Sequence, residues 1–282
     1  MDFRFSLAGL VIGILVGLTG MGGGSLLAPI LILFFRIPPV WAVGTDIAYS
    51  TVTKAVGSIV HIRQKTVNFR VALLLGCGSI PATFASVLLV QYIRHHYQNF
   101  INDVVLKALG VTLIIVAVLL VVKPIIMRRL ERRALERQKQ QALQVQNGEE
   151  TSAQVTAPVS SRWERLYRPL ITIFVGAFVG FLVGMTSVGS GTLIIVSIAF
   201  LFPRLGPKEL VGTDIFQAFM LLASGAIGYL TAGTINWPIV GLLLIGSLPG
   251  VLIGSRLSKY LPDRFMRPVL ATVLALSGLK LI

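Results

Sequence analysis

The 282-residue sequence is poor in cysteine, histidine and charged side chains. Its single cysteine, Cys77, excludes an intramolecular disulfide. The three histidines have no cysteine or acidic residue at ligand spacing, so we predict neither a metal site nor a cofactor. Only 13% of the residues are charged, whereas soluble domains carry about 25%. The composition therefore argues against a soluble enzyme or a soluble binding domain.

The sequence is rich in long apolar runs. Of its residues 55% are hydrophobic, and the mean hydropathy is +0.83. Such runs indicate segments that enter or cross a lipid bilayer. The first run lacks a convincing small-residue cleavage site, so we interpret it as retained rather than as a signal peptide. We expect apolar segments at about 5–18, 25–36, 43–61, 69–92, 104–123, 170–183, 192–202, 211–230, 237–256 and 267–282.

The net charge of +14 comes mostly from Lys and Arg between these segments, where positive charge orients a membrane protein. We therefore expect no nucleic-acid partner. A polar stretch after the fifth segment begins "MRRLERRALERQ", which predicts a solvated helix, and ends in a composition typical of a disordered linker. The expected organisation is a first membrane half over 1–123, a basic cytoplasmic loop over 124–168 and a second membrane half over 169–282.

The two halves are internally repeated. A glycine-rich break inside an apolar region occurs twice, as "GLTGMGGGSLL" and as "GMTSVGSGTLI". Three further motifs recur in the same order, which indicates a duplication of the kind that builds many secondary transporters. The paired motifs are "VGTD" at Val43 and Val211, "TVN" at Thr66 with "TIN" at Thr234, and "GSIP" at Gly78 with "GSLP" at Gly246.

The glycine breaks leave pieces of roughly 14 and 12 residues, which at about 1.5 Å per residue are too short to span a core of about 30 Å. If each pair of pieces is one crossing, the halves are parallel and six basic residues of the second half lie outside. If the pair forms a hairpin or two crossings, the halves are inverted and those residues lie inside. We therefore predict an all-α polytopic membrane protein with two inverted-topology repeats, each a glycine-broken half-helix pair followed by three transmembrane helices.

Irregular backbone is tolerated at membrane depth only where it is buried in protein or lines a cavity. The two breaks would leave free backbone N–H groups at the starts of half-helices, where an anion binds well. An alternative is that the glycines only allow helices to pack closely. From the breaks, the candidate binding residues are Gly22, Gly23, Gly24, Ser25, Ser187, Gly189, Ser190, Gly191 and Thr192.

Polar residues within the apolar segments extend this candidate site. Lys54 lies midway along 43–61, where a cation is costly, and we interpret it as an anchor for an anion or as one partner of a buried ion pair. Gln217 could donate to the anion or join two helices. Thr45 and Asp46, like Thr213 and Asp214, fall at expected helix starts, so helix capping and proton coupling are both open. His95 and His96 are expected in a loop after the fourth segment.

With these motifs, the chain resembles the sulfite exporter TauE/SafE family of membrane permeases. The resemblance covers both halves and implies a multi-pass protein of the plasma membrane, in bacteria the inner membrane. It also implies movement of sulfite, a sulfonate or a related sulfur-containing anion, usually outward. We expect a secondary transporter working by alternating access, with proton coupling open, and not an enzyme. An anion channel, or a permease for another sulfur-containing or carboxylate anion, is the alternative. The expected partners are a small anion and the bilayer, with homo-oligomerisation left open.

Overall fold

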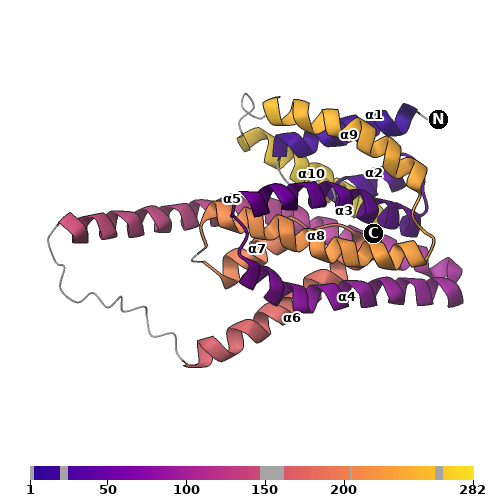
Figure 1. The fold of residues 1–282 in the computed structure, drawn as a ribbon. Helices are drawn as coiled ribbons and strands as arrows, with labels where there is room; N and C mark the ends of the chain where they lie inside the picture. The colour runs from indigo at the N-terminus through magenta and orange to yellow at the C-terminus, as the bar shows by residue number, and fades with distance from the viewer. Residues whose placement is uncertain (1–2, 20–24, 147–161, 204, 258–262) are drawn as a thin grey trace.

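The computed structural model describes residues 3–19, 25–146, 162–203, 205–257 and 263–282, and its regular structure over these ranges is helical (Figure 1). Five of the helices are long and apolar enough to cross a membrane. The described ranges form α1 (Phe3–Thr19), α2 (Leu27–Leu33), α3 (Pro39–Arg63), α4 (Phe69–His96), α5 (Gln98–Gln146), α6 (Arg162–Thr186), α7 (Thr192–Leu201), α8 (Pro207–Thr231), α9 (Trp237–Leu257) and α10 (Asp263–Leu281).

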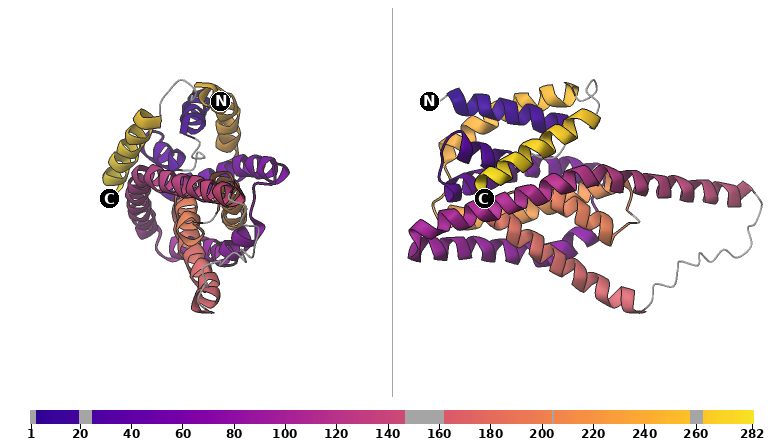
Figure 2. Two further views of the ribbon diagram at one scale, coloured as in Figure 1. Left: turned by 90° about the vertical axis from the view of Figure 1, so that its left-hand side faces the viewer. Right: turned by 180° about the vertical axis from the view of Figure 1, so that it is seen from behind.

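Every predicted apolar segment contains a helix, and the largest difference in length is at α5. This helix has 49 residues, a length of about 73 Å at 1.5 Å per residue, so its second half projects beyond the bundle (Figures 1 and 2). The basic sequence after position 127 therefore continues the membrane helix, as predicted. The predicted linker at its end lies outside the described residues. The expectation of a loop at His95 and His96 was wrong, because both belong to the last turn of α4.

Each half begins with a pair of helices on either side of its glycine-rich break. Three of these four helices are short, but α6 has 25 residues and its part Arg168–Thr186 is long and apolar enough to cross a membrane, so the half-length helix predicted there was wrong. In the first half, the rings of Phe5 and Phe35 stack with centroids 4.4 Å apart. Phe5 belongs to the first turns of α1 and Phe35 follows the end of α2, so the chain after the break returns to the level at which α1 began. In the second half, α6 and α7 flank the break and pack against each other. Helices α1 and α2 therefore run in opposite directions, as the two arms of a hairpin.

Helices α1 and α6 pack mainly on the opposite half, where glycines let two backbones approach closely. Helix α1 lies along α9 and α6 lies along α4, each pair running parallel (Figure 1). The contacts occupy equivalent positions of the two repeats. They are Gly9 with Leu243, Gly13 with Ser247 and Gly17 with Val251 in one pair, and Gly176 with Leu75, Gly180 with Ser79 and Gly184 with Thr83 in the other.

The central helices α3 and α8 run antiparallel, and the "TVN" and "TIN" motifs hold their ends together. The backbone N–H of Asn68, after α3, donates to Thr213 Oγ1 near the start of α8 (2.9 Å). The backbone N–H of Asn236, after α8, donates to Thr45 Oγ1 near the start of α3 (3.2 Å). Each Asn side chain also accepts from the backbone N–H three residues later, which caps α4 and α9.

These directions define two ends of the bundle. The basic end is where α3 ends and α8 begins, with Arg63 and Lys208, and α5 projects beyond it. The far end is where α3 begins and α8 ends. Helix α4 runs parallel to α8 and ends there, because Gln91 Nε2 donates to the carbonyl of Gly228 (2.7 Å).

Candidate functional site

A line of four polar side chains follows the face of α3 that packs toward the interior. Asp46, Ser50, Lys54 and Ser58 are spaced by four residues and all are buried. The Ser50 hydroxyl donates to Asp46 Oδ1 (3.1 Å), and the Ser58 hydroxyl donates to the carbonyl of Ile215 on α8 (3.3 Å). The shared face that the spacing predicted is therefore turned into the bundle and not toward lipid.

Lys54 is the central member of this line and has 7% of its surface exposed. It makes no hydrogen bond or ion pair with any residue in the described ranges. Asp46 is two turns away, about 12 Å along the helix axis, which is too far for a direct pair. Lys54 also lies between two equivalent contacts, of Ile47 with Gly225 and of Gly57 with Ile215, so it is near the middle of the α3–α8 pair.

Asp46 lies against a residue of the second glycine-rich break and against the helix that follows the first. Its carboxylate faces the Ser187 hydroxyl from the second break and the backbone of Ala28 at the start of α2, just after the first break. Ser187 has a φ of 60°, a left-handed conformation that is rare outside glycine and that often marks a functional position. Segments 159 residues apart in sequence are thus brought against one carboxylate.

Most predicted residues of the breaks are interior. Ser25, Ser190 and Thr192 are buried, and Gly189 has a φ of 94° that an L side chain rarely adopts. The Thr192 hydroxyl lacks a hydrogen-bond partner among the described residues, although a buried hydroxyl normally has one. Gly191 directly precedes α7. The predicted residues Gly22, Gly23 and Gly24 lie outside the described residues.

The two "GTD" motifs do not cap their own helices, because α3 begins at Pro39 and α8 at Pro207, each several residues earlier. Capping by Thr45, Asp46, Thr213 or Asp214 was therefore wrong, since their backbones already lie inside a helix. Thr45 and Thr213 instead accept from the connection after the opposite helix. Asp46 and Asp214 are both buried. The helices start early because proline fits their first turn.

Gln217 joins two helices. Its amide lies 2.6 Å from Ser79 Oγ, and in the orientation that satisfies both ends its NH₂ group donates to the carbonyl of Ala72 (2.6 Å). The repeat-equivalent residue of Gln217 is Tyr49, which our sequence analysis missed, and its hydroxyl faces Ser247, the equivalent of Ser79. Reading the second half against the first residue by residue would have revealed Tyr49.

A second buried tyrosine was also missed. Tyr229 is fully buried, and its hydroxyl donates to the carbonyl of Gly184 (3.0 Å), just before the second break. The last carbonyls of a helix have no partner within the helix, so this bond stabilises the point where α6 ends. Because α8 carries Tyr229, a movement of α8 would directly displace the end of α6 next to the second break.

A helical bundle with five membrane-length helices, a buried lysine and a buried break between α6 and α7 defines a multi-pass membrane protein with a polar centre. Residues 5–281 match the model of the family described as "Sulfite exporter TauE/SafE". The chain belongs to this family, which consists of membrane transporters and not enzymes.

Curated relatives cover all or nearly all of the chain. "Probable membrane transporter protein YjnA" of Bacillus subtilis is 35% identical over 285 residues and covers 100% of both chains. "Probable membrane transporter protein YdhB" of the same species is 22% identical over 96% of each chain. "Probable membrane transporter protein MJ0441" of Methanocaldococcus jannaschii is 25% identical over 97% of this chain and 92% of its own. No solved structure matches the chain.

Proposed function

We propose that this protein is a secondary transporter that exports a small anion, such as sulfite or an organosulfonate, by alternating access between two inverted repeats. The single observation that carries the proposal is Lys54, a buried cation without a partner in the described ranges, on the same interior face of α3 as Asp46 and two helical turns from it. A cation in such a place is costly and is retained when a charged solute compensates for it.

The directions of the helices support the inverted arrangement. The equivalent helices α3 and α8 run antiparallel, and α1 and α6 follow α9 and α4, which start at opposite ends. Arg63, Lys208 and Arg256 then fall at the end beyond which α5 carries its basic sequence. Positive residues mark the cytoplasmic side of a membrane protein, so the basic end is cytoplasmic in this proposal.

The donors at the centre support an oxyanion as the solute. Hydroxyl groups of Ser187 and Thr192 lie at the second break, and the helix that starts at Thr192 presents backbone N–H groups there. Lys54 supplies the positive charge, and hydroxyl and amide donors suit the several oxygens of a sulfite or sulfonate group. The family description names sulfite, and it is the first solute to test.

The packing between the halves supports alternating access in preference to an open channel. The hairpin of each half is held mainly by the other half, so hairpins and central helices can rock as two bodies. A channel would use the same donors without this movement. If the protein transports carboxylates and not sulfur-containing anions, the proposed mechanism stays the same and only the transported solute differs.

The test is transport by purified protein in proteoliposomes, with a panel of sulfite, methanesulfonate, sulfate and acetate under an imposed pH gradient. We expect saturable movement of sulfite or a sulfonate. Single-channel currents in planar bilayers would contradict a carrier. Wild-type vesicles that move none of these anions faster than protein-free vesicles would contradict the proposed function.

Asp46 is the proposed coupling residue. A carboxylate beside Ser187 of the second break repels an anion bound there, and like charges in contact cost several kcal/mol. Binding of the anion therefore favours uptake of a proton by Asp46. We expect Asp46→Asn to transport the anion but to lose stimulation by a pH gradient.

Asp103→Asn is the matched control for this variant, because Asp103 is an exposed carboxylate outside the site. It should respond to the gradient as the wild type does. An Asp46→Asn protein that still follows the pH gradient would remove Asp46 from coupling.

Ser187 offers a test of the second break. Ser187→Ala and Ser187→Gly both delete the hydroxyl, and we expect each to raise KM by about 3- to 10-fold, since one neutral hydrogen bond contributes roughly 1 kcal/mol. Glycine fits the φ of 60° without strain, so Ser187→Gly should melt at a higher temperature than Ser187→Ala. An unchanged KM in both variants would exclude the hydroxyl from the site.

A further inference from the structure

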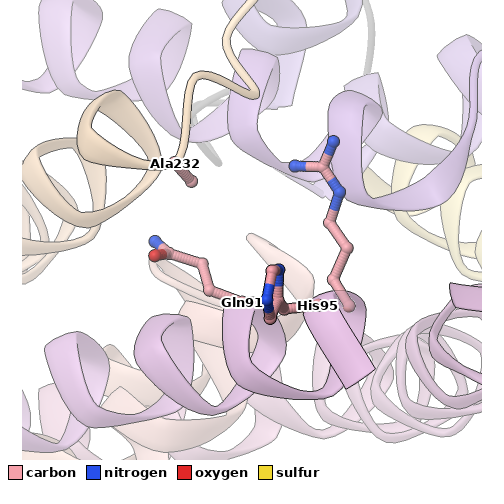
Figure 3. Close-up of a pocket in the computed structure, with 4 residues that line it drawn as sticks. Gln91, His95 and Ala232 are labelled. Carbon is pink, nitrogen blue, oxygen red and sulfur yellow. The ribbon is translucent and has the colours of Figure 1, made fainter. Parts of the chain in front are cut away.

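A cavity opens at the far end of the bundle, away from the candidate site. It has a volume of about 330 Å³ and is lined by Gln91, Arg94 and His95 from the last turns of α4 and by Ala232 after α8 (Figure 3). A neighbouring cavity of about 210 Å³ is lined by Trp41, Ile101 and Asn102 among others, and Arg94 lines both. The two cavities therefore share one guanidinium group.

Arg94 is held in place without being neutralised. Its Cζ atom lies 5.8 Å from the centre of the Trp41 ring, which orients a cation but leaves its charge. Among the described residues, none that lines either cavity is acidic and none forms an ion pair with Arg94. Gln91 is fixed by its bond to the Gly228 carbonyl. The two cavities therefore contain the half-buried guanidinium of Arg94, which has no ion pair among the described residues.

The position of these cavities follows from the repeat. At the basic end, a cavity of about 750 Å³ is lined by His61, Gln64, Lys208 and three other residues. Gln64 is the repeat equivalent of Ala232, and Lys208 is the equivalent of Val40, which lines the smaller far-end cavity. The two ends of the α3–α8 pair thus open at equivalent places, each beside one cation, with Lys54 between them.

We propose that Arg94, with His95 and Gln91, forms an anion-binding subsite at the far-end mouth, which binds the same class of small oxyanion that Lys54 binds at the centre. This inference rests on the proposed function and extends it to the route by which the anion leaves or enters. A guanidinium presents paired N–H donors that match two oxygens of a sulfite or sulfonate. A cleft with one sign of charge also raises the local concentration of its counter-ion.

The first experiment measures binding and does not need transport. Trp163→Phe and Trp237→Phe leave Trp41 as the only tryptophan, and it lies beside Arg94. Sulfite added to the detergent-solubilised full chain at constant ionic strength should change Trp41 fluorescence in a saturable way. Arg94→Gln should raise the apparent Kd by at least about 10-fold, and Arg94→Lys should raise it less.

Two controls separate the subsite from other causes. Arg36→Gln removes an exposed charge at the same end without touching either cavity, and it should titrate like the parent. Lys54→Met should also keep the Trp41 response, because the central site is separate. A titration that is the same in Arg94→Gln as in the parent would overturn the subsite.

The second experiment measures transport from each side of oriented vesicles. Arg94→Gln should raise KM for sulfite offered at the far end by about 10-fold, with an unchanged maximal rate and an unchanged KM from the basic end. Equal losses of maximal rate in both directions would show that Arg94 only maintains the fold and would overturn the subsite. Wild-type vesicles that move no anion while Trp41 still titrates would contradict the proposed function and leave the subsite standing.

Discussion

Replacing Lys54 by leucine should make the protein more stable and abolish most of its transport. The side chain is buried and unpaired in the described ranges, and a cation in the membrane interior costs roughly 2.5 to 3.5 kcal/mol on insertion scales. Loss of a buried charge partner costs a bound anion about 2 kcal/mol or more, which corresponds to about 30-fold or more in transport efficiency. Thermal unfolding in detergent and sulfite flux in proteoliposomes measure the two effects.

The repeat provides matched variants for this experiment. Leu222 is the equivalent of Lys54 and is also buried, so Leu222→Met should change neither flux nor stability greatly. The swap of Lys54→Leu with Leu222→Lys returns one cation to the middle of the α3–α8 pair and should recover part of the flux. Wild-type flux in Lys54→Leu would show that the cation does not serve the anion.

The second large effect is expected at the glycines between the halves. A methyl group at Gly246 would overlap the carbonyl oxygen of Ser6, and one at Gly78 would overlap the carbonyl oxygen of Ile173. Backbone atoms cannot move aside without shifting α1 or α6. Gly246→Ala and Gly78→Ala should therefore each lower the free energy of unfolding by roughly 1 to 3 kcal/mol or more, as an overpacked core does. We expect both variants to lose sulfite flux as well.

Gly241 is the control on the same helix as Gly246. A methyl group there meets no atom within 4 Å, and alanine is a better helix former than glycine by about 1 kcal/mol. Gly241→Ala should melt at the same or a higher temperature than the wild type. Equal stability of the Gly241→Ala and Gly246→Ala proteins would contradict the close approach of α1 and α9.

The sequence predicted helices well where apolar runs decide them. All the expected segments contain helices, because length and hydrophobicity suffice to indicate a membrane helix. The polar face of α3 was predictable from spacing alone, since positions four apart share one side of a helix. The duplication indicated which motifs are equivalent, but it did not predict that α3 and α8 pack against each other.

Contacts between distant segments were not predictable in the same way. Asp46 looked like a cap because its helix was expected to start at Val43, whereas Pro39 starts it a full turn earlier. The approach of Ser187 to Asp46 depends on how two hairpins pack, and no local pattern encodes that packing. Arg94 was missed because an arginine near a helix end is ordinary, and only the cavities beside it give it a role.

The exchange of hairpins between the halves has a consequence for biosynthesis. Helix α1 is synthesised more than two hundred residues before its glycine-lined partner α9. Until α9 is made, α1 and α2 lie in the membrane without the helix of the second half against which α1 packs. Fragments divided within 147–161 should therefore assemble when produced together, and either fragment alone should be degraded.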